Sequence, residues 1–215
     1  MYKKLGGLSM YRTKRAFSID FHKFLPYLPF IIFTLIYIIG IFIGALFVGR
    51  SSQYFDWATD LFDEFISVRQ SLDVFRVIKE SAFYTFIPFI VLFLFGTSIV
   101  GCLFIPIVMA AIGLRFGFLS GYMYITYKLN GVMLHSLIVL PASVVALFGL
   151  VLLCVESFGF AKLLSSICIN PNKSTNASSY FKTYCIKSSI TLIAGLISVI
   201  LDVTMTLLFI NFFQL

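Results

Sequence analysis

The chain has 215 residues, of which 60% are hydrophobic, 18% aromatic and only 12% charged, and its mean hydropathy is +1.01. Soluble domains carry about a quarter charged residues, so this composition excludes an ordinary soluble protein and favours an all-α, polytopic membrane helix bundle. The formal net charge is +7, but the basic residues gather at the ends of apolar spans rather than in one patch, which argues against nucleic-acid binding.

The N-terminal region, residues 1–27, is rich in Lys and Arg, and residues 28–215 form the expected membrane domain. The stretch from Tyr11 to Phe24 is basic and amphipathic, so it either lies on the inner membrane surface or forms a solvated tail. The first expected span covers 28–48 and carries Gly40 and Gly44, two small residues one helical turn apart.

The next interval, from Arg50 to Glu80, is polar and predicts an amphipathic helix on the outer side of the membrane. Its apolar residues recur at steps of three or four; they are Leu61, Phe65, Val68, Leu72 and Phe75. Four of its acids are candidate docking positions for a partner protein; they are Asp60, Asp63, Glu64 and Asp73. The alternative is that this helix only covers the bundle.

The apolar block from Ala82 to Gly113 is too long for one helix and must turn, and the expected breakers are Thr97, Ser98, Gly101 and Pro106. A short turn at Lys128 and a polar loop from Lys162 to Lys187 divide the rest of the chain. The expected spans after the first are therefore 82–100, 104–127, 132–158 and 189–213. Segment 100–112 either belongs to a span or is re-entrant.

The distribution of Lys and Arg predicts the orientation. Basic residues are more numerous in the N-terminal segment and in the loop before the last span than in the other connections, and basic loops stay in the cytoplasm. The sequence thus predicts a cytoplasmic N-terminus and an outer C-terminus.

Three glycines recur every four residues in the third expected span, namely Gly113, Gly117 and Gly121. They line one helix face and allow close approach of another helix, in this chain or in a second subunit. Arg115 lies among them, and a cation inside a hydrophobic span costs roughly 2.5–3.5 kcal/mol on insertion scales.

Asp202 is the expected partner of Arg115. Counted along their spans, both residues lie roughly 16–20 Å from the cytoplasmic end, near the middle of the membrane. An Arg115–Asp202 pair would either fix helix register or serve as a hinge or pathway element. Two further polar residues are His135, interpreted as a hydrogen-bonded or interfacial histidine, and Glu156, within reach of water or Lys162.

No pattern in the sequence indicates an enzyme or a bound cofactor. The two histidines, His22 and His135, are far apart, and no zinc-protease, serine-hydrolase or phosphate-loop motif is present. The four cysteines lack metal-ligand spacing. We therefore expect neither catalytic nor metal-binding residues.

From the first span onward the chain resembles the stage II sporulation protein M family. The similar stretches are FIIFTLIYIIGIFIGALFV from Phe30, GTSIVGCLFIPIV from Gly96, GLRFGFLSGYMY from Gly113, HSLIVLPA from His135 and IAGLISVILDVTMT from Ile193. Arg115 lies near the family's usual lysine, and Asp202 matches its mid-helix acid. Ser136 and Val139 depart from the family, replacing a glycine and a glutamate.

The resemblance implies a non-enzymatic, multi-pass protein of the bacterial plasma membrane that works through partners, as a homo- or hetero-oligomer surrounded by lipid. One interpretation is a scaffold that anchors peptidoglycan-remodelling enzymes, as in sporulation and engulfment. The alternative is a permease-like subunit of an ABC-type exporter, or of a bacteriocin export or immunity system, working with a separate ATPase. A small channel is less favoured because few polar residues line any span.

Overall fold

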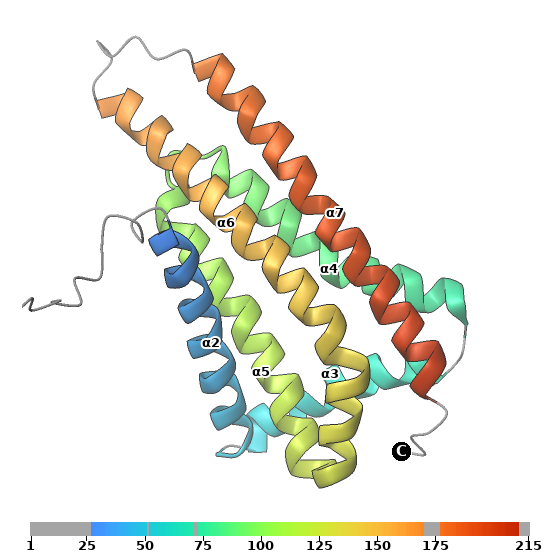
Figure 1. The fold of residues 1–215 in the computed structure, drawn as a ribbon. Helices are drawn as coiled ribbons and strands as arrows, with labels where there is room; N and C mark the ends of the chain where they lie inside the picture. Colours follow the sequence, from blue (N-terminus) through green and yellow to red (C-terminus); the bar gives the residue numbers. More distant parts are fainter. Residues whose placement is uncertain (1–26, 51, 71–72, 170–176, 211–215) are drawn as a thin grey trace, which may run out of the picture.

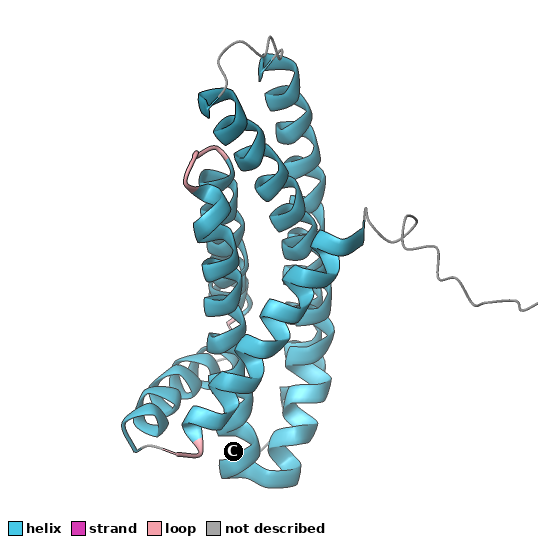
Figure 2. Ribbon diagram, turned by 90° about the vertical axis from the view of Figure 1, so that its left-hand side faces the viewer, coloured by secondary structure: helices cyan, strands magenta, loops and turns pink. Residues whose placement is uncertain are grey.

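The computed structural model describes residues 27–50, 52–70, 73–169 and 177–210, and these are helical apart from short turns. Figure 2 shows helices and brief loops throughout the described part, with no strand in it. The expected all-α class is confirmed. The basic stretch from Tyr11 to Phe24 lies outside the described residues.

Within the described residues, four helical stretches are long and apolar enough to cross a membrane; they are Leu28–Val48, Val74–Gly96, Gly101–Ile169 and Ser178–Phe209. The third is 69 residues long and folds back on itself into two legs that lie side by side (Figure 1). The chain is therefore a multi-pass membrane protein, a bundle with five long helical legs.

Helix α2 (Leu28–Val48) has the predicted bounds of the first span. Helix α4 (Val74–Gly96) begins eight residues before the predicted 82, because the Asp73 carboxylate accepts a hydrogen bond from the Phe75 amide and caps its N-terminus. The chain turns at 97–100, where Thr97 and Ser98 were expected to break the helix, and α5 (Gly101–Leu134) then runs without a break through segment 100–112. That segment therefore belongs to a span and is not re-entrant. The expectation for Pro106 is corrected, because it lies inside α5.

The predicted turn at Lys128 is where the chain reverses. Lys128 has φ 47° and ψ −119°, in a region that residues with a side chain rarely adopt. Just after this turn, the backbone at Gly131 lies so close to Met123 that a Cβ there would be 2.0 Å from the Met123 carbonyl oxygen. A short π-helix, η2 (His135–Val139), then leads into α6 (Leu140–Ile169).

Helices α6 and α7 (Ala177–Phe209) are longer than their predicted spans. At 1.5 Å per residue they measure about 45 and 50 Å, against an apolar membrane core of about 30 Å. Figure 1 shows both extending past the other helices at the end where loop 170–176 joins them. This end carries Lys162 and Lys182, both exposed.

Helix α3 (Ser52–Gln70) runs crosswise at the opposite end of the bundle (Figure 1). The predicted single amphipathic helix from Arg50 to Glu80 is thus corrected, because the chain turns after Gln70 and the rest begins α4. The buried face of α3 also differs from the apolar face that the sequence predicts. Ala58, Phe62 and Ile66 are at most 7% exposed, whereas Phe75 is 77% exposed.

The glycine ladder packs against α2 of the same chain. A Cβ on Gly113 would lie 2.4 Å from the Tyr37 carbonyl oxygen, and one on Gly117 would lie 2.2 Å from that of Ile41. Gly121 meets Ala45 in the same way. From the other side, Gly40 and Gly44 meet the α5 backbone, so two small-residue faces oppose each other.

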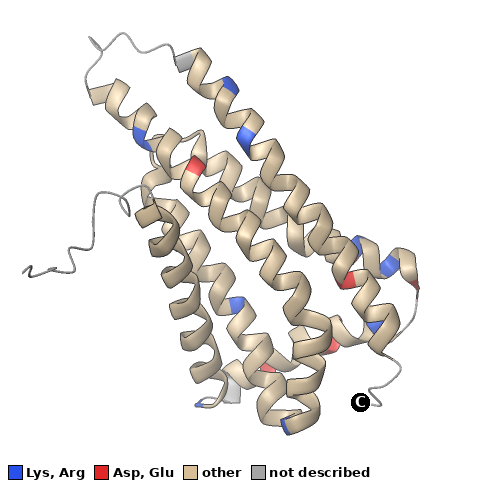
Figure 3. Ribbon diagram, in the orientation of Figure 1, with Lys and Arg blue, Asp and Glu red and all other residues tan. Residues whose placement is uncertain are grey.

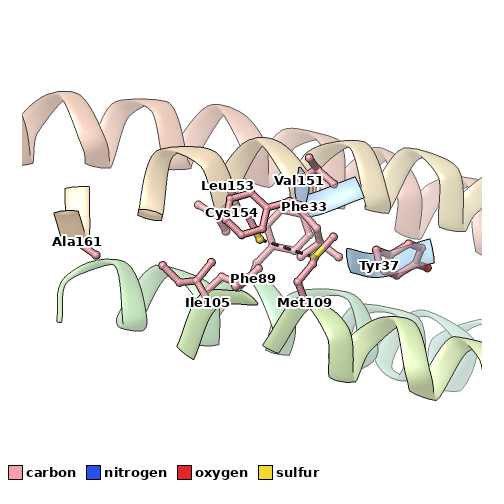
Figure 4. Packing of buried hydrophobic residues seen from close by; sticks show 11 residues of the cluster. Phe33, Tyr37, Phe89, Ile105, Met109, Val151, Leu153, Cys154 and Ala161 are labelled. Carbon is pink, nitrogen blue, oxygen red and sulfur yellow. Dashed lines mark hydrogen bonds between the residues drawn. The ribbon is translucent and has the colours of Figure 1, made fainter. Parts of the chain in front are cut away.

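A hydrophobic core fills the middle of the bundle between α2, α4, α5 and α6. Figure 4 shows Phe33, Phe89 and Ile105 converging there, together with Met109 and Cys154, whose sulfur atoms lie 3.7 Å apart. Phe89, Met109 and Cys154 are at most 1% exposed. This core holds the legs together on the side away from α3.

We predict that Gly117→Ala destabilises the bundle by about 1–3 kcal/mol, because the new methyl group overlaps the α2 backbone. Gly159→Ala in α6 is the matched control, since no atom lies within 4 Å of a Cβ built there. Thermal unfolding of both variants in detergent measures the difference. Equal stability of the two variants would contradict the α2–α5 packing.

Candidate functional site

Most charged residues lie toward the two ends of the bundle, with Arg115 of α5 between them, and α2 carries none (Figure 3). At the end opposite α3, the Lys187 ammonium lies 2.8 Å from a Glu156 carboxylate oxygen, and both side chains are partly exposed. Glu156 was expected to lie within reach of Lys162, but its partner is Lys187 of α7. At the α3 end three charged side chains are largely buried, and this second group is the candidate site.

The centre of the site is an ion pair between Arg69 of α3 and Asp202 of α7. The Arg69 Nη2 atom donates to Asp202 Oδ2 over 2.6 Å, and the two side chains are only 5% and 13% exposed. Arg69 also donates to the Phe65 carbonyl oxygen over 3.2 Å, and its guanidinium lies 3.5 Å from the centre of the Phe65 ring. These contacts tie the crosswise helix to the end of α7.

Arg69 reaches this position because it lies on the buried face of α3. It follows Ala58, Phe62 and Ile66 at steps of four, four and three residues, the period of one helix face. Three positions of this face pack into the bundle with apolar side chains, and the fourth brings in a guanidinium. A buried cation needs a counter-charge, and Asp202 provides it.

Two consecutive residues of α4 complete the buried group. The Ser81 hydroxyl donates to Asp202 Oδ2, the oxygen that also receives Arg69. The Glu80 carboxylate lies 3.8 Å from Arg69 Nη1, and its side chain is 12% exposed. Neither oxygen of Glu80 has a hydrogen-bond partner, and the same is true of Arg69 Nε. The site therefore contains buried polar groups that are not satisfied by the described chain.

The expected direct pair of Arg115 with Asp202 is corrected, because Asp202 is held by Arg69 and Ser81. The Arg115 guanidinium instead lies 4.0 Å from the centre of the Tyr84 ring, a cation–π contact between α5 and α4. Among the residues that the structure describes, Arg115 has no ion-pair or hydrogen-bond partner. Because α7 (Ala177–Phe209) begins at Ala177 rather than at 189, Asp202 lies near the C-terminal end of its helix and not at the middle.

Arg115 and Asp202 nevertheless line one cavity of about 230 Å³. Helices α3 to α7 supply most of its wall, with Tyr37 of α2. The polar side chains gather around Arg69, Glu80 and Ser81, whereas α5 and α6 contribute mainly apolar ones such as Ile112 and Leu147. The cavity thus has a charged part and an apolar part, an arrangement that suits an amphipathic ligand.

His135 is a buried, hydrogen-bonded histidine, as expected. Its Nε2 atom lies 3.0 Å from the Ser120 hydroxyl and its Nδ1 atom 2.8 Å from the Tyr124 hydroxyl, both in α5. The side chain therefore joins the two legs of the α5–α6 hairpin just beyond their turn. These contacts give it a structural role.

The candidate docking acids lie on the outer surface at the α3 end. Asp60, Asp63 and Glu64 are exposed on α3, and Asp73 is exposed at the start of α4, which it caps. No group of three or more His, Cys, Asp or Glu residues close enough to hold a metal ion occurs in the described ranges.

Comparison of the chain with family models, with curated proteins and with solved structures found no match in any of the three.

We predict that Arg69→Gln or Asp202→Asn alone destabilises the protein by about 3–5 kcal/mol, because each leaves a buried charge without its partner. The double variant should cost clearly less than the sum of the two. Unfolding in detergent gives the coupling energy.

Double-mutant cycles on two other residue pairs are the controls for this coupling. The partly exposed Glu156–Lys187 pair should couple by about 0–1 kcal/mol, and Arg115 with Asp202 by less than Arg69 with Asp202. Stronger coupling of Asp202 to Arg115 than to Arg69 would restore the pairing that the sequence suggests.

Proposed function

We propose that this chain is a non-enzymatic membrane subunit that holds partner proteins at the outer face of the bacterial plasma membrane through α3. The partner class is peptidoglycan-remodelling enzymes, as in sporulation and engulfment. Both the partner class and the bacterial location rest on the resemblance of the spans to the stage II sporulation protein M family.

The observation that carries the proposal is the way α3 is mounted. One face of the helix is buried and fixed to α7 by the Arg69–Asp202 ion pair. The other face presents Asp60, Asp63 and Glu64 to solvent. A rigidly held helix with an exposed acidic face can receive a basic partner surface without much loss of conformational entropy.

A second candidate function is a permease-like subunit of an export or immunity system with a separate ATPase. It is favoured by the opposite end, where α6 and α7 extend past the other helices and carry basic residues (Figure 1). With a cytoplasmic N-terminus, this extension lies in the cytoplasm, where a nucleotide-binding subunit would dock. The two functions therefore place the partner at opposite ends of the bundle.

We predict that the triple variant Asp60→Asn, Asp63→Asn, Glu64→Gln loses its partner while it still inserts and folds, because the changes remove charge from an exposed face only. The matched variant at the other end, Lys162→Gln with Lys182→Gln, should retain the partner. Co-purification in mild detergent, with the partners identified by mass spectrometry, measures both.

The identity of the co-purified proteins distinguishes the two proposed functions. Recovery of a cell-wall hydrolase that is lost with the α3 variant supports the scaffold. Recovery of a nucleotide-binding ATPase that is lost with the Lys162 and Lys182 variant overturns the scaffold in favour of the exporter subunit. Unchanged binding by both variants contradicts both docking surfaces.

A further inference from the structure

Two ionisable groups that line the cavity, one acidic and one basic, lack hydrogen-bond partners in the described chain. The two Glu80 oxygens are buried without a donor, and the Arg115 guanidinium has only the Tyr84 ring. A buried acceptor without a donor costs about 1–3 kcal/mol, and more when it is charged, and this applies to Glu80. Glu80 and Arg115 line the same cavity, so together they point to a ligand that supplies both a donor and an anion.

The two groups differ in their access to the surroundings. The Arg115 side chain is exposed on α5, although it lies between Gly113 and Gly117 in the middle of a membrane span. An exposed guanidinium at this depth is costly against hydrocarbon alone. Glu80 lies further inside, next to the Arg69–Asp202 pair. A ligand entering from the membrane would therefore meet Arg115 before it meets Glu80.

The remaining wall of the cavity is suited to hydrocarbon. Ile112, Leu147 and Leu150 contribute to it from α5 and α6, and Pro88 from α4. The volume of about 230 Å³ exceeds the roughly 150 Å³ of an apolar cavity that binds benzene. The space therefore suffices for a head group or for a short part of an acyl chain, while the rest of the molecule stays in the bilayer.

We propose that this cavity binds one phospholipid whose head group carries a primary ammonium and a phosphate, as an ethanolamine head does. The ammonium donates hydrogen bonds to the Glu80 carboxylate, and the phosphate accepts them from the Arg115 guanidinium. A choline head lacks N–H donors for Glu80. A glycerol head brings a negative charge without a cation, close to both Glu80 and Asp202. The proposal is independent of the docking function of α3.

The test uses the full chain in detergent and three lysophospholipids with identical tails and ethanolamine, choline or glycerol heads. Titration followed by native mass spectrometry gives their relative affinities. Hydrogen bonds to charged groups contribute about 1.5–3 kcal/mol, so we expect the ethanolamine lipid to bind about tenfold tighter or more than the choline lipid. This comparison needs no variant, so a folding defect cannot obscure it.

Two variants then assign the contacts. Glu80→Gln should remove the preference for ethanolamine over choline, whereas Arg115→Gln should weaken both of these lipids to a similar extent. Glu156→Gln at the other end of the bundle is the control and should change neither. Equal binding of the three lipids, a preference for the glycerol head, or no binding of any would overturn the proposal. So would a dimer that Arg115→Gln dissociates, because a second copy would then cover the arginine.

Discussion

The ion pair between Arg69 and Asp202 is the interaction on which the α3 end of this bundle depends. It joins a helix that lies crosswise to one that spans the membrane, in surroundings where neither charge could remain alone. Ser81 shares the same carboxylate oxygen, so α4 is tied to the junction as well. Together with the buried Ala58, Phe62 and Ile66, this contact sets the orientation of α3 above the cavity and leaves its acidic face exposed.

The arrangement lets α3 be firmly attached to the bundle on one face while the residues of its other face stay free to vary. Its inner face is held by burial and by charge, while its outer face is free to change without affecting the core. Substitutions on the outer face can therefore change the charge of that surface with little effect on the fold. The buried side has no such freedom, because an uncompensated charge at Arg69 or Asp202 destabilises the whole junction.

The spans were largely predictable because hydrophobicity and turn residues set them. The first span agrees with α2 at both ends, and the turns at 97–100 and at Lys128 lie where the polar and small residues indicated. The glycine spacing also gave the packing face of α5. The sequence did not show whether this face packs within the chain or against a second subunit. In the structure its partner is α2 of the same chain.

The partner of Asp202 was not predicted because two helix starts were misplaced. The sequence did not reveal the true beginnings of α4 and α7, so Glu80 was assigned to the outer amphipathic helix and Asp202 to the middle of the membrane. A signal for Arg69 did exist, since it follows Ala58, Phe62 and Ile66 on one face of an amphipathic helix. A cation on an apolar face implies a buried acid, and Asp202 was among the few acids that could supply it.

The close packing of α2 against α5 has a consequence for how the protein is made. The two helices are separated in the chain by α3 and α4, and yet they form the most extensive helix pair in the structure. During synthesis α2 enters the membrane well before α5 emerges, since chains are made from the N-terminus. Its Gly40 and Gly44 face must therefore remain against lipid until α5 arrives, whereas α6 and α7 can pair as soon as they are made. The α2–α5 pair therefore forms only after α3 and α4 have been made, although α2 enters the membrane first.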